Sequence, residues 1–149
     1  MPEDIIPFDL ENPIYKNLHI QLATFFGGPL AATWLIAENF KQLGQNEKIK
    51  NSWIWGIAIF IVFIALVFTI PESWHIPNYM IPLICLGLAS VITKKLQGER
   101  IQQHILDGGR IYSAWRAIGI GIICLVITVA VIFTIAVIQN RINGNMAGA

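Results

Sequence analysis

Charged residues are scarce in this chain of 149 residues. Asp, Glu, Lys and Arg together make up 13% of it, and 55% is hydrophobic. Soluble globular proteins carry about 25% charged residues, so the composition excludes an ordinary soluble domain and indicates an integral membrane protein. The formal net charge of +1 gives no support to nucleic-acid binding.

Cysteine and histidine are also rare. Cys85 and Cys124 lie inside apolar stretches and form no CxxC pattern, which excludes a disulfide framework and the common zinc motifs. His19, His75 and His104 are not accompanied by matched cysteine or carboxylate ligands. We therefore expect no metal, haem or other cofactor.

Signatures of catalysis are missing as well. The sequence has no HExxH motif, no Ser-His-Asp set and no pair of carboxylates inside an apolar run, and Asp107–Arg110 (DGGR) is not a phosphate loop. Glu38 lies near the end of an apolar run, and we interpret it as a solvated carboxylate; an ion or proton site is the alternative. We expect a protein that is not an enzyme.

The N-terminal residues "MPEDIIPFDLENP" are acidic and contain three prolines. They lack the basic leader and unbroken apolar run of a secretory signal, and they carry no lipidation motif. We expect this segment to remain in the mature protein.

Four apolar runs have the length of a membrane span, which requires roughly 20 residues for a hydrocarbon core of about 30 Å. The second and fourth are unbroken, whereas the first contains Gly27-Gly28-Pro29 and the third is short and contains Pro82. The sequence predicts one all-α domain with four transmembrane helices, at about residues 20–40, 52–70, 78–94 and 115–138.

The distribution of Lys and Arg predicts the orientation, because these residues concentrate on the cytoplasmic side. With four crossings, eight of the ten fall on one face and two on the other. We therefore predict a multi-pass protein of the plasma (bacterial inner) membrane with both termini external. Its parts are an acidic external tail (1–12), a basic cytoplasmic elbow containing a short helix (95–112) and a flexible external tail (143–149).

Pro29 lies in the middle of the first run. Proline has no amide hydrogen and crowds the carbonyl four residues earlier, here that of Phe25, which predicts a kink. We interpret the run as a kinked but continuous helix over about 13–43, with Asn12-Pro13 at its start and Gly44 at its end. A re-entrant segment is the alternative.

Small residues recur at every fourth position in the first and fourth runs, where they allow helices in lipid to approach closely. We predict that these two helices meet along the stripes, or that one meets a partner subunit. The second run lacks such a stripe and is predicted to face lipid. The predicted packing residues are Ala23, Gly27, Gly28, Pro29, Ala31, Ala32, Ser113, Ala117 and Gly121.

The elbow holds the densest polar cluster of the sequence. Arg100, His104 and Asp107 are spaced to share a helix face, and Arg110 and Arg116 follow. Such a face could bind a lipid headgroup or an acidic partner, or it could be the solvated basic loop that the orientation already requires.

Two functions follow from these observations. The first is an accessory, scaffold or assembly subunit that contacts other membrane subunits as well as the lipid bilayer. The second is a homo-oligomeric small transporter or channel, with a pathway near Gly27-Gly28-Pro29 lined by Thr24 and Thr33. Because buried charge is absent, we favour the first.

Overall fold

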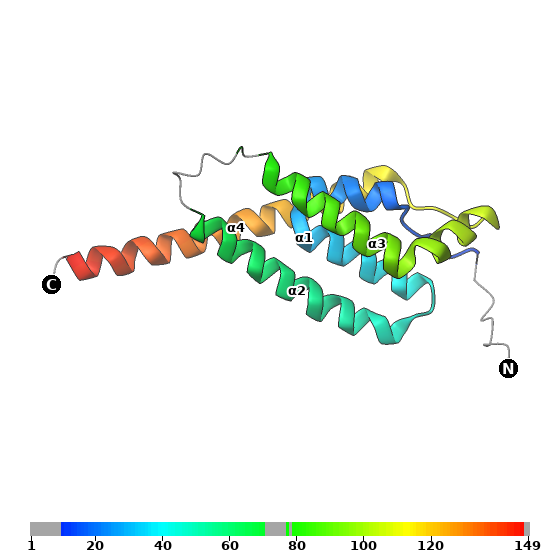
Figure 1. The fold of residues 1–149 in the computed structure, drawn as a ribbon, viewed down its shortest axis with the longest axis horizontal. Coiled ribbons are helices and arrows are strands. Elements are labelled where there is room, and N and C mark those ends of the chain that lie inside the picture. Colours follow the sequence, from blue (N-terminus) through cyan, green and yellow to red (C-terminus); the bar gives the residue numbers. More distant parts are fainter. Residues whose placement is uncertain (1–9, 71–76, 78, 148–149) are drawn as a thin grey trace.

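Four helices make up most of the described part of the protein. The computed structural model describes residues 10–70, 77 and 79–147, which form α1 (Asn17–Gln42), α2 (Asn46–Thr69), α3 (Met80–Leu106) and α4 (Ala114–Ala147) (Figure 1). By total length and composition all four are candidates to cross a membrane, which confirms the predicted all-helical, multi-pass membrane protein. His75, one of the histidines considered above, lies outside the described residues.

Helix α1 is broken at Gly28. The backbone there has φ 62° and ψ −154°, a conformation that only glycine adopts readily. Pro29 then occupies the first position of a new helical segment, where its missing amide hydrogen removes no helical bond. The Thr33 hydroxyl donates to the Pro29 carbonyl at 2.8 Å. Proline is therefore tolerated because it begins a helix and does not interrupt one.

The break reverses the direction of the chain. The Asn39 side chain accepts from the Tyr15 amide at 2.7 Å and donates to the Tyr15 carbonyl at 2.9 Å. A straight helix would hold residues 15 and 39 about 36 Å apart, at 1.5 Å per residue. Helix α1 is therefore a V-shaped hairpin, with one arm over 17–27 and the other over 29–42 (Figure 1).

Each arm of the hairpin is shorter than a bilayer. At 1.5 Å per residue the arms measure about 16 and 21 Å, against a hydrocarbon core of about 30 Å. The interpretation of residues 13–43 as a kinked but continuous helix is wrong, because the chain reverses at Gly28. The hairpin has the shape of the alternative, a re-entrant segment. A proline kink bends a helix, but the glycine-specific backbone at Gly28 turns it back.

The residues before α1 lie beside the turn between α3 and α4. The Arg110 amide donates to the Leu10 carbonyl at 3.0 Å, and the Tyr112 amide donates to the Ile14 carbonyl at 2.9 Å. This pairing, which includes a parallel bridge between Ile14 and Ile111, delays the start of α1 to Asn17. The predicted start at Pro13 and the predicted placement of this segment opposite the elbow are both wrong.

Two helices end at the same end of the molecule with the same backbone motif. Gly44 after α1 and Gly108 after α3 have φ values of 70° and 78°. Their amides and the next ones bond back into the helix, as in a Schellman motif, with Gln45 to Phe40 and Gly109 to His104 each at 2.8 Å. The predicted stop at Gly44 is confirmed.

The last two helices are longer than the spans predicted from hydropathy. Helix α3 continues without interruption to Leu106, so most of the predicted elbow is the end of α3 and not a separate helix. Helix α4 continues to Ala147, beyond residue 138 and into the segment predicted as a flexible tail.

The hairpin forms the core of the molecule. Within the described part of the chain, extensive packing joins α1 to each of the other helices, and these pack little against one another. In the most apolar stretch of α1 61% of the residues are buried, against 6% in α2. The main core cluster consists of Tyr15, Ile20, Ala23, Ala31, Ala32, Leu35, Ile36, Phe40, Ala89, Ala117 and Cys124.

Candidate functional site

The seam between α1 and α4 brings together four of the nine predicted packing residues, Ala23, Gly27, Ala117 and Gly121. A Cβ built on Gly27 would lie 2.5 Å from the Gly121 carbonyl oxygen and 2.8 Å from the Cys124 Cβ. A Cβ built on Gly121 would lie 2.8 Å from the Ala23 carbonyl oxygen. Ala117, at the start of the seam, is fully buried. Backbone therefore meets backbone along this seam, as only small residues permit.

The other predicted packing residues have different surroundings. Ala31 and Ala32 are buried in the core cluster, and Pro29 and Ala32 also face a groove between α2 and α3. Ser113 is exposed and caps α4, since its hydroxyl accepts from the Trp115 amide at 3.3 Å. A Cβ built on Gly28 would have no neighbouring atom of another segment within 4 Å. Glycine is therefore required here by the positive φ and not by a lack of space for a side chain.

A buried polar cluster closes the open end of the hairpin. Besides its bonds to Tyr15, the Asn39 amide donates to the Gln97 side-chain oxygen at 3.3 Å, and Gln97 donates to the Ile36 carbonyl at 2.9 Å. Asn39 and Gln97 are at most 1% exposed. A buried amide needs such partners, so this cluster joins the second arm of α1 to α3 and to the segment that precedes the first arm.

Next to it lies a partly exposed cluster of aromatic and charged side chains. The Tyr15 and Tyr112 rings stack with centroids 4.4 Å apart, and the Arg116 guanidinium lies 4.1 Å from the Tyr112 ring centroid. The Gln42 amide donates to Glu38 at 2.8 Å and to the Tyr112 hydroxyl at 3.2 Å. Burial raises the pKa of both tyrosines, and the Arg116 charge opposes this. Both phenols therefore remain neutral at physiological pH.

The residues of the predicted polar cluster in the elbow differ in exposure and in their partners. His104 is buried, and its Nε2 donates to the Arg110 carbonyl at 3.1 Å while its ring covers Gly109. Asp107 is exposed at the C-cap of α3. Arg100 is exposed, and its Nη1 lies 2.7 Å from the side-chain oxygen of Gln45 when that amide is oriented to accept. Of the three residues predicted to share a helix face, His104 is therefore not available to a ligand, and only Arg100 and Asp107 are exposed.

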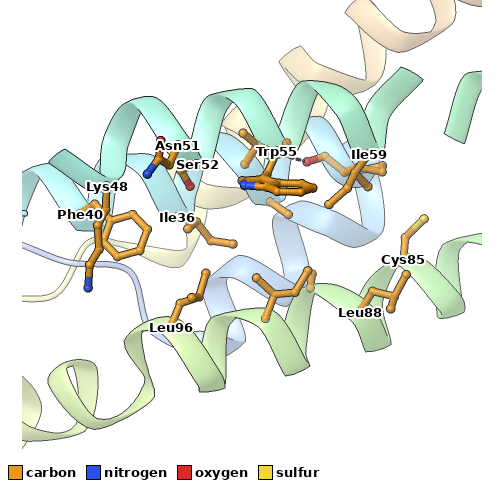
Figure 2. A pocket seen from close by; sticks show the side chains of 16 residues that line it. Ile36, Phe40, Lys48, Asn51, Ser52, Trp55, Ile59, Cys85, Leu88 and Leu96 are labelled. Atoms are coloured by element: carbon orange, nitrogen blue, oxygen red, sulfur yellow. Dashed lines mark hydrogen bonds between the residues drawn. The ribbon is translucent and has the colours of Figure 1, made fainter. Parts of the chain in front are cut away.

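A groove separates α2 from α3, with the second arm of the hairpin as its floor (Figure 2). Its volume is about 730 Å³. Lys48, Asn51 and Ser52 lie at one end, whereas the other end is apolar, with Ile59 and Cys85 on opposite walls (Figure 2). The groove is lined by Pro29, Ala32, Thr33, Ile36, Phe40, Lys48, Asn51, Ser52, Trp55, Gly56, Ile59, Cys85, Leu88, Ala89, Ile92 and Leu96.

Among the described residues, no cluster of three His, Cys, Asp or Glu side chains is placed to hold a metal ion. Cys85 and Cys124 are both free thiols, the first facing the groove and the second buried in the seam.

The groove, the Asn39 cluster and the tyrosine stack were not predicted from the sequence. One signal was available in α3, where Ala89, Thr93, Gln97 and Ile101 recur at every fourth position and all are buried. A polar residue on such a stripe indicates a buried hydrogen-bonding partner. The groove has no comparable signal, since it depends on how far apart two helices lie.

No protein-family model matches the chain, and neither a curated protein nor a solved structure is significantly similar to it.

Proposed function

We infer that the protein is a non-catalytic accessory or scaffold subunit of a larger membrane assembly. The inference rests on the second half of α4, whose side chains are not covered by the other described helices. The buried residues of α4 are Ala117, Gly121, Cys124 and Thr128, and beyond Thr128 the described side chains are exposed or half-buried. In this half Val129 is 56% exposed and Phe133 is 69% exposed.

The hairpin explains why this surface is left open. Its arms reach only about 16 to 21 Å, so α4 leaves the core after Thr128 and continues alone for almost 30 Å at 1.5 Å per residue. Figure 1 shows this half of α4 projecting away from the other helices. This lateral surface includes the exposed small residues Ala130 and Thr134, four positions apart, which permit close contact with a helix of another subunit.

The orientation follows from the same hairpin. With α1 re-entrant, α2, α3 and α4 cross the membrane, and the described N-terminal residues lie on the side of the α3–α4 turn. Nine of the ten Lys and Arg residues then fall toward the cytoplasmic face, and Arg141 alone toward the other. This division is more uneven than the eight to two expected for four crossings. The proposal therefore has a cytoplasmic N-terminus and an external C-terminus, in a bacterial inner membrane.

The geometry does not favour a channel at Gly27-Gly28-Pro29. Gly27 is buried against Gly121 and Cys124, which leaves no space for a solute there. Thr24 donates to the Ile20 carbonyl at 2.6 Å and is fully buried. The groove on the other side of the break is lined mainly by apolar side chains, which do not suit an aqueous path.

Cross-linking in native membranes tests the assembly. In a variant with Cys85 and Cys124 replaced by Ala, Phe133→Cys labelled with a maleimide–benzophenone reagent should give a discrete cross-linked species on irradiation, because the photoreactive group needs no thiol on the partner. Ala117→Cys, placed in the buried seam, is the control and should give none. Mass spectrometry of the product then distinguishes another subunit from a second copy. A monomer at every position tested along the second half of α4 would contradict the proposal.

Labelling in whole cells tests the orientation. A membrane-impermeant maleimide should label Ile142→Cys in intact cells, and it should label Leu10→Cys only after the membrane is permeabilised. Labelling of both positions from outside would restore the four-crossing topology and reject the re-entrant hairpin.

A further inference from the structure

We propose that the groove between α2 and α3 binds one anionic phospholipid, with its headgroup at Lys48 and an acyl chain along the apolar floor. The inference concerns α2 and α3 and is independent of the assembly proposed for α4. Its volume of about 730 Å³ lies within the range of about 300–1,000 Å³ that is typical of ligand sites.

The lining of the groove is amphiphilic along its length. Lys48, Asn51 and Ser52 come from the first two turns of α2, so they lie at the end where the basic residues gather. The Lys48 ammonium lies 5.8 Å from the Phe40 ring centroid, at the mouth of the groove. From there inward, the walls are formed by Trp55, Ile59 and other apolar side chains (Figure 2). One cation and two hydrogen-bonding groups above an apolar channel complement a phosphate headgroup and its chain.

The site lies at the depth where anionic headgroups occur. Lys48 is in the first turn of α2, and the groove extends from it toward the bilayer centre, with Pro29 of the hairpin tip among its lining residues. Basic pockets between transmembrane helices on the cytoplasmic side are recognised sites for anionic lipid headgroups. In addition, the amide groups at the start of α2 favour a negative charge there.

The shape of the walls favours a lipid chain over a helix of a second copy. Close helix packing in membranes requires small residues on the contact face. The exposed walls of this groove carry the large side chains Trp55, Leu88 and Leu96, which are 71%, 55% and 52% exposed. A flexible acyl chain can follow such a surface, whereas a helix backbone cannot approach it closely.

Native mass spectrometry of the full, delipidated protein tests the proposal with two probes of identical acyl chains, phosphatidylglycerol and phosphatidylcholine. One phosphatidylglycerol should bind, in preference to phosphatidylcholine. Lys48→Gln should weaken phosphatidylglycerol binding about fivefold and leave phosphatidylcholine unchanged, the loss expected for one interfacial cation. Lys50→Gln is the matched control, because Lys50 is exposed and does not line the groove.

A second pair of variants tests the acyl-chain channel. Leu88→Trp narrows the groove and should weaken both lipids, whereas Ile84→Trp, on the same helix but outside the lining, should weaken neither. Equal effects of Lys48→Gln and Lys50→Gln would overturn the proposal. A dimer that Leu88→Trp dissociates would overturn it too, by showing that a second copy fills the groove. If Leu88→Trp does not fold, the lysine pair still decides.

Discussion

Of helices α1 and α2, the more apolar helix is the less buried. Helix α2 is much the more apolar of the two, yet only 6% of its most apolar stretch is buried, against 61% in α1. Helix α1 contains Gln21, Thr24, Thr33 and Asn39, and all of these side chains donate hydrogen bonds within the protein.

The difference follows from the solvent. In water, apolar residues gather in the core, but lipid chains are as apolar as leucine and give no such driving force. A membrane helix that is apolar all round can face lipid, whereas glycine, broken backbone and polar side chains require protein around them. For this chain, low hydropathy therefore marks the core and high hydropathy marks the surface.

The largest effect should come from enlarging a glycine in the α1–α4 seam. Gly121→Leu places atoms where the Ala23 backbone lies, and neither backbone can move without separating the helices. We expect a loss of about 4 kcal/mol or more in the free energy of unfolding, seen as loss of monodisperse protein in detergent. Gly119→Leu is the control, since a Cβ at Gly119 meets nothing within 4 Å. Equal yields of the two variants would contradict the seam.

A leucine removed from the core should cost more than an isoleucine removed from the lipid surface. Leu35 is fully buried, whereas Ile61 is 61% exposed. Leu35→Ala should reduce the free energy of unfolding by about 3 kcal/mol, because it leaves a cavity. Ile61→Ala should change it little, because lipid fills the vacated space. Thermal unfolding in the same detergent compares them, and the reverse order would show that α2 has a protein partner in that preparation.

Removal of the Asn39 side chain should loosen the base of the hairpin. Asn39→Ala leaves the buried Tyr15 amide and carbonyl without these partners, at a cost of about 2 kcal/mol. Hydrogen exchange should then accelerate at Tyr15 and over the start of α1, with little change in α2. Gln103→Ala, at an exposed position of α3, is the control. Uniform exchange across all helices would refute a local role.

The smallest effect concerns pH. Burial raises the pKa of Tyr15 and Tyr112 in the folded protein. Their contribution to stability is therefore complete below the unfolded pKa of about 10, and it is lost as pH rises through the higher folded values. Melting temperatures should fall above about pH 10, and less steeply in Tyr112→Phe than in Tyr79→Phe, where Tyr79 is 66% exposed. Identical profiles would exclude a contribution from Tyr112.

Several features of the fold were predictable because they depend on local chemistry. The four apolar helices follow from composition and run length, and the ends of α1 and α3 follow from Gly44 and Gly108. The packing residues Gly27 and Gly121 were identified from spacing alone, since small side chains in lipid mark close approach.

The path of α1 could not be obtained in this way. Gly-Gly-Pro is compatible with a kink and with a reversal, since in both geometries the chain needs no helical hydrogen bond from the Pro29 nitrogen. The charge distribution separates the two topologies by one residue only, because two crossings lie between the basic loops in both cases and Lys16 alone changes sides. The groove and its Lys48 site could likewise not be predicted from the sequence, since a cavity depends on the distance between helices.

The sequence by itself determined that this is a helical membrane protein with glycines poised for close packing, because hydropathy and residue size are local properties. Only the tertiary structure decided that the first helix turns back at Gly28. That choice rests on contacts across 24 residues, between Asn39 and the Tyr15 backbone, and on the fit of Gly27 against Gly121. Such contacts form only when the whole chain has folded, and they convert an apparent span into the core.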